Sequence, residues 1–131
     1  MALLDRLSAW FSRIDKSLLG IFELEIVEDR HDRFELKTRR GHFVFDGRRR
    51  VVSRNGRTLL RFEQVKSIDV IADKDTGGFS EWKIDLYVNF LRRIRVGTTL
   101  DDAQASMVGA RIITITGAKG IGWKERHDIR Y

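Results

Sequence analysis

The spacing of hydrophobic residues first changes at Gly20. Before this glycine, large apolar residues recur every three or four positions, which is the spacing of one face of an α-helix. They are Leu3, Leu4, Leu7, Trp10, Phe11, Ile14 and Leu18. Because glycine commonly ends helices, the pattern predicts an amphipathic N-terminal helix over residues 1–20. Its polar face lacks the strong Lys/Arg excess of membrane-surface helices, so we expect it to dock on the domain or to pair with a second copy.

After Gly20 the hydrophobic period falls to two. Apolar and polar residues alternate in short runs rich in aromatic and β-branched side chains, as in strands with one buried face. The runs cover residues 22–26, 34–36, 43–45, 51–53, 58–62, 65–72, 82–88 and 92–96. The breaks between them are shorter than the crossover of roughly a dozen residues that parallel neighbours need. The sequence therefore predicts about seven antiparallel strands over residues 21–98.

A second helix is predicted over residues 99–117. We expect Thr98 or Thr99 to cap it, with the following aspartates in the first turn, where the helix dipole favours negative charge. Gly117 suits its end. The predicted buried stripe of this helix contains Ala103, Met107, Val108, Ala110, Ile112 and Ile113. In the tail, residues 118–131, we expect a short strand near residues 121–123.

This order of elements predicts one α+β domain built on a bent antiparallel sheet or partly closed barrel, with a C-terminal helix as a cap. From Ile21 to Gly117 the order resembles the small pleckstrin-homology-like domains of bacteria. The resemblance is carried by the capped C-terminal helix and by two strand patterns, Trp82-x-Ile84-x-Leu86 and Arg92-Arg93-Ile94-Arg95. It implies a binding or assembly scaffold rather than an enzyme. A small barrel of the oligonucleotide-binding kind is the rival fold.

The composition agrees with a single folded domain. The chain has 131 residues, of which 42% are hydrophobic and 34% charged, and it contains no cysteine, which excludes disulfides, thiolate metal sites and thiol nucleophiles. No apolar run approaches the roughly 18 residues of a membrane span. Charged residues interrupt the apolar N-terminal stretch, which is atypical of a secretory signal, so we expect a cytoplasmic protein without a transmembrane segment.

Positive charge is concentrated in one window. Eight of the 25 basic residues lie between Lys37 and Arg57, where Asp46 is the single acidic residue, whereas the net charge of the whole chain is +6. Asn55-Gly56 within this window suits a two-residue type I′ hairpin turn. With these two residues as the loop, regular alternation would place four arginines on one face of the hairpin: Arg50, Arg54, Arg57 and Arg61.

We interpret this face, extended by Arg39 and Arg40, as an anion-binding site, because the guanidinium group matches phosphate and carboxylate geometry. Like charges that face each other across two strands repel, and a bound anion would relieve that repulsion. The partner would be an acidic protein surface or a lipid headgroup. A solvated strand face that is neutralised by glutamates of neighbouring strands is the alternative without a function. A nucleic-acid interface is disfavoured, because Phe43, Phe45 and Phe62 would have to be exposed to stack on bases.

The sequence contains no recognisable catalytic constellation, metal site or cofactor motif. Residues 73–78 begin like a calcium loop, but Ile84 stands where a bidentate glutamate is needed. His31, His42 and His127 lack metal-ligand spacing. The glycines of residues 117–122 follow a predicted helix, whereas a phosphate-binding loop leads into one. We therefore expect a non-enzymatic binding or assembly module, with a basic nucleic-acid-binding barrel as the alternative.

Overall fold

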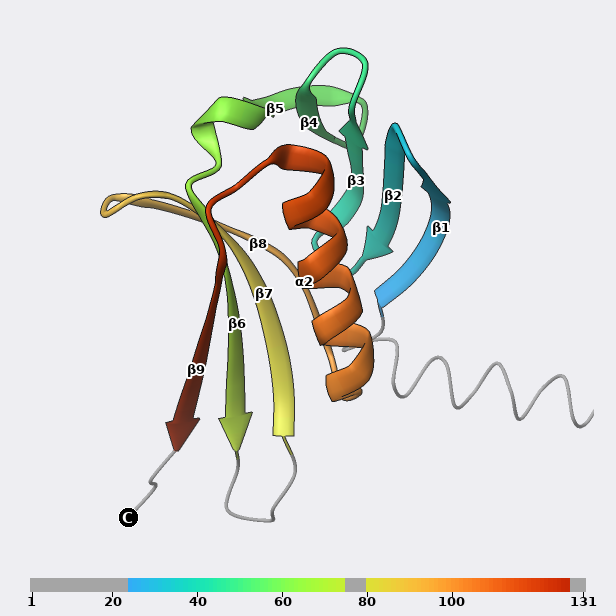
Figure 1. The fold of residues 1–131 in the computed structure, drawn as a ribbon. Helices are drawn as coiled ribbons and strands as arrows, with labels where there is room; N and C mark the ends of the chain where they lie inside the picture. The colour runs from blue at the N-terminus through green and yellow to red at the C-terminus, as the bar shows by residue number, and fades with distance from the viewer. Residues whose placement is uncertain (1–23, 75–79, 128–131) are drawn as a thin grey trace, which may run out of the picture.

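The computed structural model describes residues 24–74 and 80–127, so the helix predicted for residues 1–20 lies outside the described part. The described chain forms two β-sheets and one α-helix (Figure 1). Sheet A is an antiparallel meander in sequence order, made of β1 (Leu24–Arg30), β2 (Arg33–Thr38), β3 (Gly41–Asp46), β4 (Val51–Arg54) and β5 (Arg57–Arg61). Sheet B has the order β8-β7-β6-β9, made of β6 (Ser67–Lys74), β7 (Ser80–Asn89), β8 (Arg92–Thr99) and β9 (Ile121–His127).

The α+β class is confirmed, with eight strands between Leu24 and Thr99 where we expected about seven, but the described strands do not close into a barrel. Two separate sheets stand in place of the bent, partly closed barrel that we expected. The break between them is the short 3₁₀ turn η1 (Phe62–Gln64). Its Gln64 side chain accepts a hydrogen bond from the Arg61 backbone N–H at 2.8 Å, and Phe62 is buried, so the chain leaves sheet A here and begins sheet B.

The tail forms β9, which is longer than expected and pairs in parallel with β6, so that Ile68 lies opposite Ile121. β9 can pair in parallel with β6 because the helix α2 (Asp102–Thr116) forms the crossover connection between β8 and β9. In Figure 1, α2 lies between the two sheets, and it contacts β6 and β7 on one side and β2 and β3 on the other. No helix in the described part is long and apolar enough to cross a membrane.

The buried face of α2 differs from the predicted stripe. Ala103, Met107 and Ala110 are exposed, whereas the buried residues are Ala105, Val108, Gly109, Ile112 and Thr116. The small residues face the sheet because the helix approaches it closely: a Cβ on Gly109 would lie 3.3 Å from Val70 Cγ2. The periodicity of large side chains could not reveal this close approach.

The ends of α2 are set by Asp101 and Gly117. The Asp101 side chain caps the helix by accepting a hydrogen bond from the Ala103 backbone N–H at 3.0 Å, so the predicted caps Thr98 and Thr99 are wrong. Thr99 is buried, and its hydroxyl lies 2.7 Å from Gln104 Oε1. Gly117 ends the helix in the left-handed conformation, with φ 75°, as predicted.

One core holds both sheets and the helix together. It contains apolar side chains from sheet A, sheet B and α2, among them Phe34, Leu36, Phe43, Phe45, Phe62, Ile68, Ile84, Leu86 and Ile112. Arg111 fastens α2 to sheet A: its Nε lies 2.5 Å from Asp29 Oδ1, and its guanidinium stands 5.6 Å from the centre of the Phe34 ring. The helix therefore bridges the two sheets through both apolar and charged contacts.

The sheets also touch directly where β2 ends. The Thr38 hydroxyl donates a hydrogen bond to the Val96 carbonyl oxygen of β8 at 2.5 Å. A Cβ on the adjacent Gly97 would lie 2.6 Å from Thr38 Cγ2, closer than any real contact. Glycine at this position therefore allows β2 to lie against β8, and we call this contact the sheet junction.

We predict that Gly97→Ala lowers the free energy of unfolding by about 1 to 3 kcal/mol, because the added methyl group overlaps Thr38. Thr38→Ser keeps the hydroxyl and removes the methyl group nearest to Gly97. In a protein that carries Thr38→Ser, Gly97→Ala should therefore cost at least about 0.5 kcal/mol less unfolding free energy than in the wild type. Urea unfolding of the two single variants and the double variant measures the difference. If Gly97→Ala lowered the unfolding free energy equally in the wild type and in Thr38→Ser, the sheet junction would be contradicted.

Candidate anion-binding site

The predicted hairpin turn is present at Asn55 and Gly56. Both residues have positive φ, 52° and 81°, as a type I′ turn requires. Arg54 lies opposite Arg57, and Ser53 lies opposite Thr58, as predicted. Two arginines therefore face each other at the end of the hairpin.

Beyond Ser53 the predicted register is wrong. A β-bulge at this point places Val52 opposite Leu60 and Val51 opposite Arg61, whereas regular pairing from the turn would place them opposite Leu59 and Leu60. The bulge brings Val52 and Leu60 to the same face, where both are fully buried, and so the apolar contact overrides the regular register. Arg61 consequently alternates to the face opposite that of Arg54.

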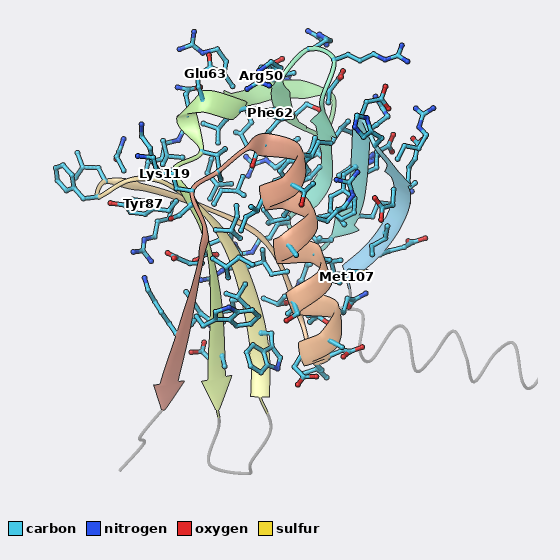
Figure 2. All side chains as sticks on the ribbon, in the orientation of Figure 1. Arg50, Phe62, Glu63, Tyr87, Met107 and Lys119 are labelled. Atoms are coloured by element: carbon cyan, nitrogen blue, oxygen red, sulfur yellow. The ribbon has the colours of Figure 1, made fainter. Side chains whose placement is uncertain are left out.

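The single face of four arginines is therefore not formed, because Arg50 and Arg61 lie at the other end of the hairpin. Arg50 stands in the turn before β4 with φ 55°, and its guanidinium is 5.7 Å from the centre of the Phe62 ring (Figure 2). Arg61 Nε lies 3.4 Å from Glu63 Oε1. Both cations have partners within their own part of the fold.

Arg39 and Arg40 do lie beside Arg54 and Arg57. The β2–β3 turn and the β4–β5 turn share one end of the meander and are joined through Asn55, whose N–H donates to the His42 carbonyl at 2.8 Å. A Cβ on Gly41 would lie 3.0 Å from Arg54 Cγ. We call this end of sheet A, with its four exposed arginines, the basic end. Among the side chains that the structure describes, residues 24–73 and 81–124, no carboxylate lies within ion-pair distance of any of the four.

A cleft opens where the basic end meets sheet B. It has a volume of about 440 Å³ and lies between the β2–β3 turn and strands β7 and β8; its lining residues are Arg39, Arg40, Glu81, Lys83, Arg95, Gly97 and Thr98. The sheet junction forms one border, since Gly97 belongs to both. We call it the junction cleft. Of the seven lining residues that the structure describes, four are cations and one is an acid, so this part of the lining favours an anion.

The two cations on the sheet B wall of the cleft are fixed by aspartates. Arg95 Nε and Nη2 lie 2.9 and 3.2 Å from the two carboxylate oxygens of buried Asp85, and this hydrogen bonding raises the pKa of Arg95 above its usual value. Lys83 forms an ion pair with Asp73. The wall is thus held in place by internal ion pairs, whereas Arg39 and Arg40 are available to a ligand.

The outer face of sheet B carries a second buried aspartate, directly opposite the first. Asp69 lies opposite Asp85 across β6 and β7, and it is bound by Arg93 at 3.2 Å and by Lys124 at 3.3 Å. A Cβ on Gly122 would lie 2.7 Å from Asp69 Oδ1, so that glycine makes room for the carboxylate. Both aspartates are bound by cations, and we interpret the pair as structural.

Glu35 supports the strands that carry the basic end. Its carboxylate lies 2.7 Å from Arg33 Nη2 and 2.9 Å from His42 Nε2, next to the β2–β3 turn. Burial alone would raise the pKa of Glu35, but the hydrogen bonds from His42 and Arg33 outweigh it and hold the pKa below the usual 4.5. The ionised carboxylate therefore contributes to stability.

Lys83 and Arg95 were not predicted as site residues. Arg95 belongs to the basic strand that carries the family resemblance, and strand alternation could have placed both residues on the outer face of sheet B. No sequence signal joins them to Arg39, because the sheet junction connects residues 58 positions apart. Among the described residues, no three His, Asp or Glu side chains are close enough together to hold a metal ion.

No protein-family model, curated protein or solved structure matches this chain. The relationship to pleckstrin-homology-like domains therefore stays a prediction, and the function must be inferred from the cleft and its charges.

We predict that stability falls in acid partly through Glu35. Because its folded pKa is lowered, its contribution is complete above about pH 4.5 and is lost as pH falls through the lower folded value. Glu35→Gln should cost about 1 to 2 kcal/mol of unfolding free energy at pH 7, and this difference from the wild type should shrink below pH 4.5.

Urea unfolding across this pH range measures the effect. Glu25→Gln, which alters an exposed carboxylate of β1, is the matched control and should follow the wild type. A Glu35→Gln deficit that stays constant down to pH 3 would show that Glu35 does not contribute through its charge.

Proposed function

We propose that this domain is a non-enzymatic binding module that holds a phosphate or carboxylate group of its partner in the junction cleft. The observation that carries the proposal is the placement of Arg39 and Arg40: both line the cleft, both are exposed, and neither has a carboxylate partner among the described residues. Free guanidinium forks bind such groups with paired hydrogen bonds.

The rest of the cleft supports binding rather than catalysis. Lys83 and Arg95 add positive potential, but their own ion pairs keep them in place, so an incoming anion meets a preorganised wall. Among the described lining residues Glu81 is the one carboxylate, and the acid opposite it across β6 and β7, Asp73, is already paired with Lys83. A nucleophile with an adjacent base is the arrangement that group transfer requires.

A nucleic-acid partner has weaker support. The phenylalanines of the basic window and its flank, Phe43, Phe45 and Phe62, are at most 1% exposed and form part of the core. They are not accessible for stacking, which supplies much of the affinity of single-strand binders. We therefore propose an acidic protein surface or a free or lipid-borne phosphate as the source of the anion, and a cytoplasmic location stays part of this proposal.

The N-terminal segment stays the proposed element of self-association. Its apolar face lies outside the described residues, and the proposal rests on the spacing of Leu3, Leu7, Trp10 and Ile14 in the sequence.

We predict that Arg39→Ser/Arg40→Ser lowers the affinity for inorganic pyrophosphate at least about tenfold, because two charge-assisted contacts are lost. Arg48→Ser/Arg49→Ser is the matched control: it removes the same charge from the β3–β4 turn at the opposite end of sheet A and should change the affinity less than about threefold. Titration followed by amide NMR shifts measures both variants. The wild-type shifts should centre on Arg39, Arg40, Gly97 and Thr98.

If both double variants lost affinity for pyrophosphate equally, binding would depend only on the net charge of the protein, and the cleft would not be a specific site. Arg54→Ser/Arg57→Ser extends the test to the second turn. It should weaken binding less than Arg39→Ser/Arg40→Ser, and it should leave stability unchanged or a few tenths of a kcal/mol higher, because the two arginines face each other. Comparing pyrophosphate with a synthetic acidic peptide then separates a phosphate from a carboxylate ligand.

A further inference from the structure

The β7–β8 hairpin ends in two large apolar residues that nothing in the described fold covers. Phe90 is 84% and Leu91 82% exposed, the highest values among the exposed large hydrophobic residues of the described part. Figure 1 shows this hairpin projecting from sheet B, away from α2 and from the core. Neither residue has a positive φ, so the turn accepts most residue types and does not itself require Phe-Leu.

The tip is held by its own hydrogen bond. The Leu91 backbone N–H donates to Asn89 Oδ1 at 2.9 Å, and Asn89 lies opposite Arg92 across the turn. Both apolar side chains are thus presented by an ordered turn at the end of two long strands. Presentation of this kind lowers the conformational cost of binding.

Basic residues surround the base of the tip. Arg92 and Arg93 follow it directly, and the exposed Lys66 and Lys119 lie beside it. The Lys66 backbone N–H donates to the Tyr87 carbonyl at 2.8 Å. The Lys119 backbone N–H donates to the Lys66 carbonyl at 3.0 Å. Figure 2 shows Tyr87 and Lys119 together at this base. We call these four cations the collar.

The acidic groups near the collar are already bound. Arg93 lies 3.2 Å from buried Asp69, with its guanidinium 5.2 Å from the centre of the Tyr87 ring, and the exposed Glu63 lies 3.4 Å from Arg61. The collar therefore keeps an excess of positive charge next to an apolar tip.

We propose that Phe90 and Leu91 insert into the surface of an anionic lipid bilayer, with the collar against the lipid phosphates. Apolar side chains next to cations are the combination that binds such an interface. A protein partner is a poorer fit, since a convex tip of two side chains presents far less area than the roughly 1,000 Å² of a specific interface. The proposal is independent of the junction cleft, which lies at the Gly97 end of β8, whereas the tip lies at its Arg92 end.

Co-sedimentation with vesicles of equimolar phosphatidylcholine and phosphatidylserine tests the proposal. We expect the wild type to bind these vesicles and to bind pure phosphatidylcholine much more weakly. Phe90→Ser/Leu91→Ser should lower vesicle affinity at least about tenfold. Val27→Ser/Met107→Ser removes two other exposed apolar side chains and is the matched control, which should bind like the wild type.

Two further variants make the result specific. Phe90→Trp should retain binding, and quenching of its tryptophan fluorescence by brominated lipid should exceed that of the wild type, because the new indole enters the bilayer. Added to the Arg39→Ser/Arg40→Ser variant, which loses pyrophosphate binding, Phe90→Ser/Leu91→Ser should still lower vesicle affinity at least about tenfold, and this separates the insertion from the function proposed for the cleft.

Three outcomes would overturn the insertion. The tip variant could bind vesicles as strongly as the wild type, the new indole could show no added quenching, or the wild type could fail to bind the anionic vesicles. If the wild type instead shows a concentration-dependent association that only Phe90→Ser/Leu91→Ser abolishes, the tip is a contact between copies of the chain. Thermal unfolding of each variant confirms that the fold is intact.

Discussion

The contact between Thr38 and the Val96–Gly97 backbone determines how the parts of this molecule meet. Two sheets that share a core and a helix could lie at many angles to each other, and this contact fixes the end of β2 against the edge strand of sheet B. It works because Gly97 has no side chain. The β2–β3 turn follows Thr38 directly, so the same contact carries Arg39 and Arg40 over β7 and β8 and creates the junction cleft.

The meander topology explains why the basic window is divided. Successive turns of an antiparallel meander alternate between the two ends of the sheet, so the β2–β3 and β4–β5 turns share one end and the β3–β4 turn lies at the other. Arg39, Arg40, Arg54 and Arg57 gather at the first end, while Arg48–Arg50 lie at the second, where Arg48 meets Asp32 at 2.7 Å and Arg50 covers Phe62. One stretch of sequence thus supplies both a candidate site and ordinary surface charge.

The hydrophobic period predicted the strand positions, and turn and capping residues predicted the Asn55-Gly56 turn and the extent of α2, because these features depend on neighbouring residues. Prediction from the sequence failed where contacts between residues far apart in the chain determine the structure. The bulge in β5 arises because Val52 and Leu60 both enter the core, which rotates Arg61 away from Arg54. Lys83 and Arg95 join the site only through the sheet junction. The exposed Phe90-Leu91 pair was visible in the sequence as two apolar residues at a strand boundary, but only the projecting hairpin reveals that no described residue covers it.

The central claim is that β2 ends against Gly97 and thereby places the basic turn over sheet B. A nuclear Overhauser experiment on the full chain tests it directly, by measuring transfer between the γ-methyl group of Thr38 and the α protons of Gly97. The structure predicts a strong signal, because the position of a Cβ on Gly97 lies 2.6 Å from that methyl carbon. Absence of the signal, with the Asn55–His42 contacts within sheet A still present, would show that the sheets meet elsewhere and that the junction cleft does not exist.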